Sequence, residues 1–339
     1  MLKVSTAPHF YTPKNTTKIM LDVIIALLPA GAAALIFFGL NALITILTAV
    51  AACVTFEYIC CRWLLKIKPT TGDLSAVVTG LLLAYNLPCN IPVWMTLIGC
   101  FVAIVITKVA FGGIGKNLFN PALVGRVFLF VSFPMQMTSW IKPQAWNFLN
   151  IDATTAATTL GILKHADIID VATSATQMAK DETAGKIADL LPNWYDMFIG
   201  NIGGSTGEIS AVALLLGLFW LLYRRVISWH IPFYYTATFF MLNAAFWFYT
   251  ENQVFEPITQ LLSGGLLLGA FFMATDYTTS PMSINGKIIF AVGCGVLTFV
   301  IRQYGAYPEG VSFAILIMNA FVPLIDKAVK PRIFGTGRK

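Results

Sequence analysis

The chain has 339 residues, of which 57% are hydrophobic and only 11% are charged, and its formal net charge is +6. Soluble globular domains carry roughly a quarter charged residues, so the composition excludes an ordinary soluble domain and predicts a membrane protein. The positive charge could suggest nucleic-acid binding, but the positions of the charges indicate membrane topology instead.

The first 18 residues contain three lysines and two prolines but no apolar stretch that ends in a small-residue cleavage site. We therefore expect no signal peptide, and we expect the first membrane helix to act as the targeting signal. The six cysteines form no C-x-x-C pattern, so the sequence predicts neither a disulfide framework nor a zinc site.

Apolar runs along the chain predict an all-α, polytopic membrane protein with about ten transmembrane helices. About 20 apolar residues in a helix cross the hydrocarbon of a bilayer, and a lipid-exposed helix satisfies its own backbone hydrogen bonds. The third helix should be short, and the fifth should be irregular because it contains Pro121 and Arg126. The expected spans are 20–38, 42–61, 74–87, 93–111, 119–137, 208–223, 229–249, 258–275, 287–303 and 310–325.

The charges between these helices predict the orientation of the chain. With a cytoplasmic N-terminus, 16 of the 22 lysines and arginines face the cytoplasm and five face outward. Because positive residues gather on the cytoplasmic side, both termini should be cytoplasmic. The long polar segment after the fifth helix, residues 138–206, should then be extracytoplasmic.

Ten helices divide into two halves of five, which have opposite orientations because five is odd. The sequences at 79–84 and 263–269, on the third and eighth helices, resemble each other and support such an inverted repeat. Inverted repeats with interrupted helices are typical of channels and transporters; alternatively, glycine and leucine are simply common in membrane helices. We expect a first membrane repeat in 1–137, the loop in 138–206, and a second repeat with a cytoplasmic tail in 207–339.

The long outer loop contains a threonine-rich sequence that is suited to covalent modification. Asp152, Thr155 and Thr158 are separated by small residues, and this pattern is typical of a threonine to which FMN is attached through its phosphate. Small neighbours leave room for a flavin transferase, loops commonly carry such functions, and a loop of this length is usually functional or disordered. The alternative is an ordinary threonine-rich turn or helix start.

A second candidate site follows the glycine-rich stretch at 112–115. Glycine lets the backbone approach a flat ligand closely. Asn117 and Asn120 can share one face of a helix start, and their amides match the donors and acceptors at the edge of an isoalloxazine ring. Asp276, at the matching inner end of the eighth helix, would join this site. The alternatives are a glycine-rich turn capped by asparagine and a solvated acid.

Three further acidic residues lie within or beside the expected helices. We expect Asp22 to pair with Lys18 four residues before it, Glu57 to extend towards the interface, and Glu208 to stabilise a helix N-terminus. No pair of acids stands out as an ion site. The sequence contains neither a P-loop nor a dinucleotide-binding glycine fingerprint, so the chain itself should not bind NAD.

Motifs along nearly the whole chain resemble the RnfD family, the D-type membrane component of the Rnf electron-transport complex, and more distantly the NqrB component of the sodium-pumping NADH:quinone reductase. The blocks at 113–122 and 138–140 are the most specific, and further matches occur at 18–21, 81–84, 132–137, 229–232, 268–272, 275–276, 307–314 and 322–326.

In that family, FMN is bound by a phosphoester to the threonine of a motif like Asp-Gly-x-Ser-x-Ala-Thr-Pro-Leu. The motif falls on residues 152–160 and implies that Thr158 carries the flavin. Ala153 and Thr155 stand where the family has Gly and Ser. Thr159 replaces the usual proline and places a second hydroxyl beside the acceptor.

The resemblance implies a flavin-carrying subunit of an enzyme, an ion-translocating ferredoxin:NAD oxidoreductase that moves Na⁺ or H⁺ across the bacterial cytoplasmic (inner) membrane. It implies covalent FMN on Thr158 and a non-covalent riboflavin near Asn117 and Asn120. The implied partners are the other Rnf subunits (A, B, C, E and G), a flavin transferase and membrane lipid, with no nucleic acid. The rival prediction is a small-solute channel or transporter, which would have no use for an acceptor threonine.

Overall fold

The computed structural model describes residues 15–66, 70–143, 158–164, 192–250, 256–305, 307 and 309–330. Within these ranges the regular elements are helices, as expected for an all-α membrane protein. They are α1 (Thr16–Ile59), η1 (Cys60–Leu64), η2 (Thr71–Asp73), α2 (Ser75–Tyr85), α3 (Val93–Phe101), η3 (Val102–Val109), α4 (Pro121–Ser132), α5 (Pro134–Met137), α8 (Trp194–Ile199), α9 (Ala211–Tyr223), α10 (His230–Thr250), α11 (Pro257–Leu262), α12 (Leu266–Leu268), η4 (Gly269–Met273), α13 (Ile284–Tyr304) and α14 (Val311–Ala328).

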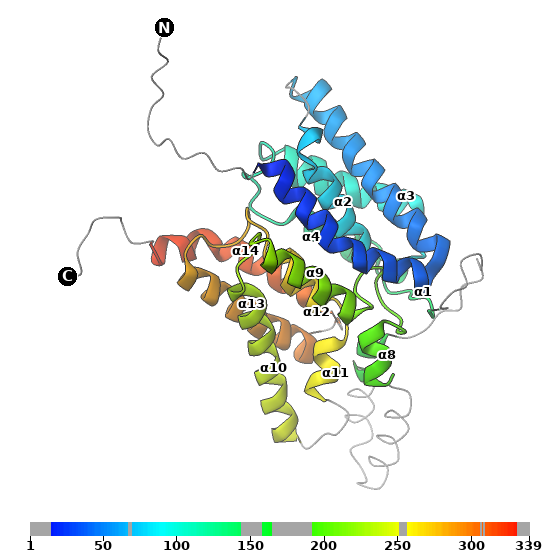
Figure 1. Cartoon of the computed structure of the whole chain (residues 1–339), viewed down its shortest axis with the longest axis vertical. Helices are drawn as coiled ribbons and strands as arrows, with labels where there is room; N and C mark the ends of the chain where they lie inside the picture. Colours follow the sequence, from blue (N-terminus) through cyan, green and yellow to red (C-terminus); the bar gives the residue numbers. More distant parts are fainter. Residues whose placement is uncertain are drawn as a thin grey trace, which may run out of the picture.

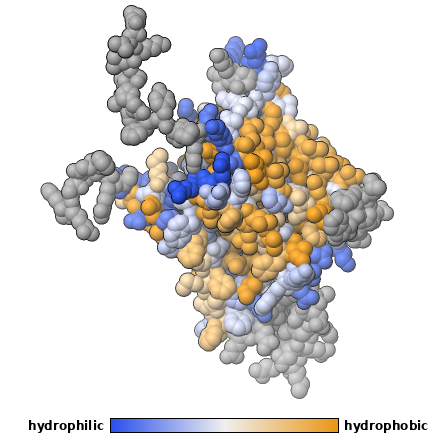
Figure 2. Space-filling view, in the orientation of Figure 1, coloured by the Kyte–Doolittle hydropathy of each residue, from blue (hydrophilic) through white to orange (hydrophobic). Residues whose placement is uncertain are grey.

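The surface of the molecule has the apolar character of a membrane protein. Among the described residues, three helices are long and apolar enough to cross a bilayer, namely α1 with η1, α13 and α14. Large apolar side chains such as Leu47, Phe219 and Leu324 are exposed on helix surfaces. Figure 2 shows hydrophobic residues over most of the middle of one face, with hydrophilic residues at its margins.

Helix α1 contains the first two expected spans. The backbone at Gly39 is not helical, with φ 60° and ψ −137°, a conformation that glycine adopts without steric cost. Figure 1 shows α1 bending sharply, so that its two parts form the arms of a V. The expected break between 20–38 and 42–61 is therefore present at Gly39, where two helical parts meet at a kink.

Two of the expected spans are divided in the structure, namely the fifth, which was expected to be irregular, and the eighth, which was expected to be continuous. The span 119–137 is divided at Phe133 (φ −134°, ψ 61°), which precedes Pro134, because proline disfavours helical geometry in the residue before it. The span 258–275 is divided between α11 and α12, where Gly264 has a positive φ of 65°.

The described helices leave the start of α1 and the end of α14 on the same side of the molecule. Helices α8 and α11 lie on the opposite side (Figure 1). These two sides define the two ends at which the candidate sites are found.

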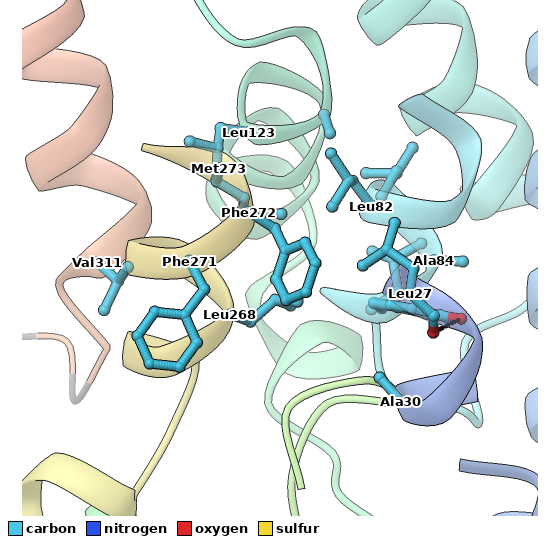
Figure 3. Packing of buried hydrophobic residues seen from close by; sticks show 14 of the residues in the cluster. Leu27, Ala30, Leu82, Ala84, Leu123, Leu268, Phe271, Phe272, Met273 and Val311 are labelled. Carbon is cyan, nitrogen blue, oxygen red and sulfur yellow. Dashed lines mark hydrogen bonds between the residues drawn. The ribbon is translucent and has the colours of Figure 1, made fainter. Parts of the chain in front are cut away.

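Aromatic and aliphatic side chains fill the space between the two halves of the chain. Figure 3 shows Phe272 of η4 directed towards Leu82 of α2 and Leu27 of α1, while Phe271 points the other way, towards Val311 of α14. All five residues are buried. Side chains of the short elements α2 and η4 therefore face each other in the centre of the molecule.

Helix α9 approaches α1 closely at Gly217, and this contact yields a prediction. A Cβ atom at Gly217 would overlap the carbonyl oxygen of Ala26 and lie 2.7 Å from Cζ of Phe272. We expect Gly217→Ala to lower the free energy of unfolding by about 1–3 kcal/mol, because the interior has no room for the methyl group. Thermal unfolding in detergent measures the change.

The matched control is Gly72→Ala, since a Cβ atom there meets no atom within 4 Å. That variant should unfold like the wild type. Equal stability of Gly217→Ala and the wild type would contradict the close helix contact.

Candidate functional site

A cavity lined by Asp276 lies beside the start of α1 and is called the Asp276 cavity. It encloses about 810 Å³ of empty space, counting its open mouth. Asn117 and Asn120 line it together with Asp276, so the structure brings the three residues of the second candidate site together. Apolar side chains, including Leu82 and Phe272, form the rest of its wall.

A chain of hydrogen bonds connects Asn117 to Asp276. Asn117 Nδ2 donates to Thr278 Oγ1 (3.1 Å), and Thr278 Oγ1 donates to Asp276 Oδ2 (2.9 Å). Burial raises the pKa of the Asp276 carboxyl, while hydrogen bonds from Thr278 and Thr279 lower it. The cavity therefore contains a carboxyl group and an amide in fixed relation to each other.

Asn120 stabilises the fold as well as lining the Asp276 cavity. Its Oδ1 caps α4 by accepting from the amide of Ala122 (3.1 Å), and its Nδ2 donates to the carbonyl of Met273 (3.2 Å). The three glycines at 112, 113 and 115 all have positive φ angles. The alternative of a glycine-rich turn capped by asparagine thus describes this segment correctly, and it is compatible with a ligand in the cavity.

Lys108, which lines the Asp276 cavity, belongs to a buried ion pair that sequence reasoning missed. Lys108 Nζ donates to Glu57 Oε2 (2.8 Å) and to Ser75 Oγ (2.6 Å), and Thr70 Oγ1 donates to Glu57 Oε1 (2.6 Å). The expectation that Glu57 extends to the interface is wrong, because it is only 1% exposed. Its partner lies 51 residues away, beyond any local pattern.

A second cavity, lined by Thr158 and called the Thr158 cavity, lies at the opposite end of the molecule. Its empty space is about 280 Å³, counting its open side, and Thr159, Glu208 and Glu309 also line it. Asp152 and Thr155 lie outside the described residues. The structure therefore brings Thr158 next to two acidic side chains that are distant in sequence.

The two candidate acceptor hydroxyls differ in their surroundings. Thr158 is half-buried, and its Oγ1 accepts from the amide of Gly161 (3.0 Å) at the start of a helical turn. Thr159 is buried, with 5% of its surface exposed. Thr158 is the more accessible of the two.

The segment that carries Thr158 is attached to the end of α13. Lys164 Nζ donates to the carbonyls of Arg302 (3.3 Å), Gly305 and Tyr307 (3.4 Å). A lysine at a helix C-terminus satisfies carbonyls that lack helical partners. The leucines at 160 and 163 are buried, so both polar and apolar contacts hold the segment against the helices.

Arg126 connects the two halves of the chain beneath the Thr158 cavity. Its Nη1 donates to Asn86 Oδ1 (2.9 Å) and Ser312 Oγ (2.8 Å), and its Nη2 pairs with Glu309. These partners come from the end of α2, the start of α14 and the segment before α14. The sequence signal was an arginine inside an apolar helix, which is costly unless it is paired.

Two other acidic residues have contacts that the sequence did not predict. Asp22 forms an ion pair with Arg224 (3.1 Å), 202 residues away, in addition to any contact within its own helix. Glu208 does not cap α9, because Ser210 Oγ accepts from the backbone amide of Ala213 in the first turn of that helix. Glu208 Oε1 instead accepts from the backbone amide of Ser205 (3.0 Å). The Asp22 carboxylate is thus placed by a tertiary contact, and that of Glu208 by the turn that precedes α9.

In the part of the chain that the structure describes, no group of three or more His, Cys, Asp or Glu side chains could hold a metal ion. The six cysteines are free and buried. The chemistry available at the two cavities is therefore that of carboxyl, amide, hydroxyl and ammonium groups.

Comparison with known proteins gives a consistent result. The sequence pattern of the NQR2, RnfD, RnfE family matches residues 3–335. The chain is 45% identical over 336 residues to a protein from Acetobacterium woodii, the D component of a Na⁺-translocating ferredoxin:NAD⁺ oxidoreductase complex, with 98% of this chain and 95% of the relative covered.

Two further relatives match over similar lengths. The D component of a proton-translocating ferredoxin:NAD⁺ oxidoreductase complex from Clostridium ljungdahlii is 44% identical, with 99% of this chain and 96% of the relative covered. The D component of an ion-translocating oxidoreductase complex from Shigella dysenteriae is 36% identical, with 99% of each chain covered.

Proposed function

The chain belongs to the NQR2, RnfD, RnfE family, and from this premise we propose that it is the flavin-carrying membrane subunit of an ion-translocating ferredoxin:NAD⁺ oxidoreductase. The observation that carries the proposal is the accessible Thr158 hydroxyl, which lies at one end of the molecule while the Asp276 cavity lies at the other. Two flavins at these places would provide two redox centres at opposite sides of the protein.

The first flavin is FMN, bound through its phosphate to Thr158 as in the family motif. The residues present fit the group: the hydroxyl is half-buried, its neighbour Gly161 is small, and glycines at 203, 204 and 264 line the cavity beside it. The flavin would supply the electron-carrying chemistry. Thr158 anchors it, and the contacts of Lys164 hold the anchor segment in place.

The second flavin is a non-covalent riboflavin in the Asp276 cavity. The cavity has apolar walls suited to a flat ring and polar groups at Asn117, Thr278 and Asp276 suited to its edge, as is typical of small-molecule sites. In this proposal Asn117 and Asp276 orient the ring, and Leu82 and Phe272 exclude water from one face.

We extend the proposal to ten membrane crossings in two inverted five-helix repeats. Helical segments occupy all ten of the expected ranges. In each half the third element is short or broken: α2 ends before the Asn-Leu-Pro sequence at 86–88, and α11 is separated from α12. Both termini would be cytoplasmic and residues 138–206 extracytoplasmic, in the bacterial inner membrane.

The partners in this proposal are the other Rnf subunits (A, B, C, E and G), which supply and accept the electrons, and a flavin transferase that loads Thr158. The ion moved is Na⁺ or H⁺, and the relatives' names include one of each.

The test of the function uses a strain that encodes the whole complex. Deleting the gene for this chain should abolish ferredoxin-dependent NAD⁺ reduction by isolated membranes, and returning the gene should restore it. Unchanged redox activity, together with solute uptake that depends on the chain, would favour the rival channel or transporter instead.

The riboflavin site yields its own prediction. Asp276→Leu in the purified complex should lower the amount of riboflavin extracted by mild denaturation several-fold, because the leucine removes the carboxyl group that Thr278 holds at the ring edge. Extraction followed by chromatography measures it, with the covalent FMN of the same sample as internal standard.

Asn243→Leu is the control, because Asn243 is also a buried polar residue but does not line the Asp276 cavity. Loss of riboflavin in both variants, or in neither, would contradict a site at Asp276.

A further inference from the structure

Glu208 is a buried carboxyl group with only one of its two oxygens satisfied. The residue is 4% exposed, and Oε1 accepts from the amide of Ser205 (3.0 Å). Among the described residues, Oε2 has no hydrogen-bond partner, and neither has the adjacent, fully buried hydroxyl of Ser205. A buried carboxylate with an unpartnered oxygen is costly, whereas its protonated form carries no charge to compensate.

Within the described ranges of the chain, no charged group forms a direct ion pair with Glu208. Arg126 from α4 forms an ion pair with Glu309 and donates hydrogen bonds to Asn86 and Ser312. A methyl group at Gly265 would lie 2.6 Å from Glu208 Oε2 and 3.6 Å from Arg126 Nη1. The carboxyl and the guanidinium are therefore neighbours, but the guanidinium is committed to Glu309.

The fourth charged group is Arg302 from α13. Its Nη1 and Nη2 donate to the carbonyls of Gln260 (2.7 Å) and Ser263 (3.1 Å). Two arginines and two glutamates make the cluster neutral when both acids are ionised. One proton added to Glu208 then gives the cluster a charge of +1.

The cluster lies directly beside the flavin anchor. Thr158, Glu208 and Glu309 line the same cavity. An electron delivered to a flavin on Thr158 would bring negative charge next to this buried cluster, where charges interact more strongly than in water. A proton bound at Glu208 would offset that charge.

We propose that Glu208 is a proton-binding site that is loaded when an electron reaches the flavin on Thr158, an inference that rests on the proposed function. One electron arrives from the reduced redox centre of a partner subunit, and one proton from water forms an O–H bond at Glu208 Oε2. When the electron moves on, this O–H bond breaks and the proton returns to water. Charge is balanced at each step.

The chemistry of the site favours a proton over a metal cation. A proton needs one oxygen, and Glu208 Oε2 supplies it. A hard metal cation needs several oxygen ligands, whereas the unpartnered oxygens of this segment are Glu208 Oε2 and Ser205 Oγ, and the guanidinium of Arg126 would repel it.

The experiment uses the purified complex with wild-type chain, Glu208→Gln, or the control Glu256→Gln. Glu256 is an acid in the segment before α11, and its Oε2 accepts from Trp194 Nε1 (3.0 Å); it does not line the Thr158 cavity. Redox-induced infrared difference spectra report protonation of carboxyl groups. Potentiometry at several pH values measures the midpoint potential of the Thr158-linked flavin. Spectra of the Thr158→Val complex are subtracted to remove the contribution of the other redox centres.

We expect reduction to produce a carboxylic-acid band in the wild type and in Glu256→Gln that is lost in Glu208→Gln. The midpoint potential of the Thr158-linked flavin should depend on pH in the first two and lose most of that dependence in the third. A band and a pH dependence that persist in Glu208→Gln would overturn the inference, as would a dependence on Na⁺ concentration at fixed pH that Glu208→Gln abolishes.

Flavin fluorescence on a denaturing gel separates this outcome from failure of the proposed function. If all three complexes carry the fluorescent band but behave alike in the infrared, the inference about Glu208 is wrong and the flavin site stands. If the wild type has no fluorescent band, the proposed function fails first.

Discussion

Replacing Thr158 by valine should remove the covalent flavin completely. Valine has nearly the shape of threonine but lacks the hydroxyl oxygen that would carry the phosphoester. The expected result is a fluorescent band in the wild-type chain on a denaturing gel, and no band in Thr158→Val, when both are produced in cells that contain a flavin transferase. Mass spectrometry of the peptide should show the loss of one FMN.

Thr159→Val is the matched control for this experiment. Thr159 is adjacent and lines the same cavity, but it is buried, so its substitution should leave most of the fluorescence. Fluorescence that persists in Thr158→Val and disappears in Thr159→Val would move the attachment site by one residue. A wild-type chain without fluorescence would contradict the covalent flavin altogether.

Replacing Lys108 by methionine should cause a large loss of stability. The side chains of Lys108 and Glu57 are 4% and 1% exposed, so the substitution leaves a buried carboxylate without its cation. Removing one partner of a buried pair typically costs about 3–5 kcal/mol. Thermal unfolding of the purified chain in detergent, followed by circular dichroism, measures the change.

Two further variants separate the ion pair from a general packing effect. Arg224→Met breaks the pair with Asp22, in which the arginine side chain is 49% exposed, and it should cost no more than about 1 kcal/mol. The double variant Glu57→Gln with Lys108→Met should regain much of the lost stability, because no unpaired charge remains. Additive losses in the double variant would show that the two side chains do not act as a pair.

The positions of the helical segments could be predicted from sequence because they depend on local composition. Long apolar runs identify membrane helices directly, and the interruptions at Pro134 and Gly264 coincide with residues that disfavour a helix. The span 258–275 was predicted as continuous and is divided, whereas the span 119–137 was expected to be irregular. Hydrophobicity alone does not distinguish one long helix from two short ones that meet in the interior.

The candidate sites were predicted in part. Asn117, Asn120 and Asp276 stand out by residue type and spacing, and the structure brings them to one cavity. Lys108, in the same cavity, looks in the sequence like one of many cytoplasmic positive charges. Its role depends on Glu57, and no periodic pattern connects residues 51 positions apart.

The sequence by itself determined the membrane class, the family and the threonine that is the candidate flavin acceptor, because composition and short motifs are local properties of the chain. The tertiary structure decided which charges are paired. Arg126 contacts Glu309 from 183 residues away, and Thr158 shares a cavity with Glu208. These pairings arise because buried polar groups must find partners wherever the packed helices bring them, and helix packing is a property of the whole chain.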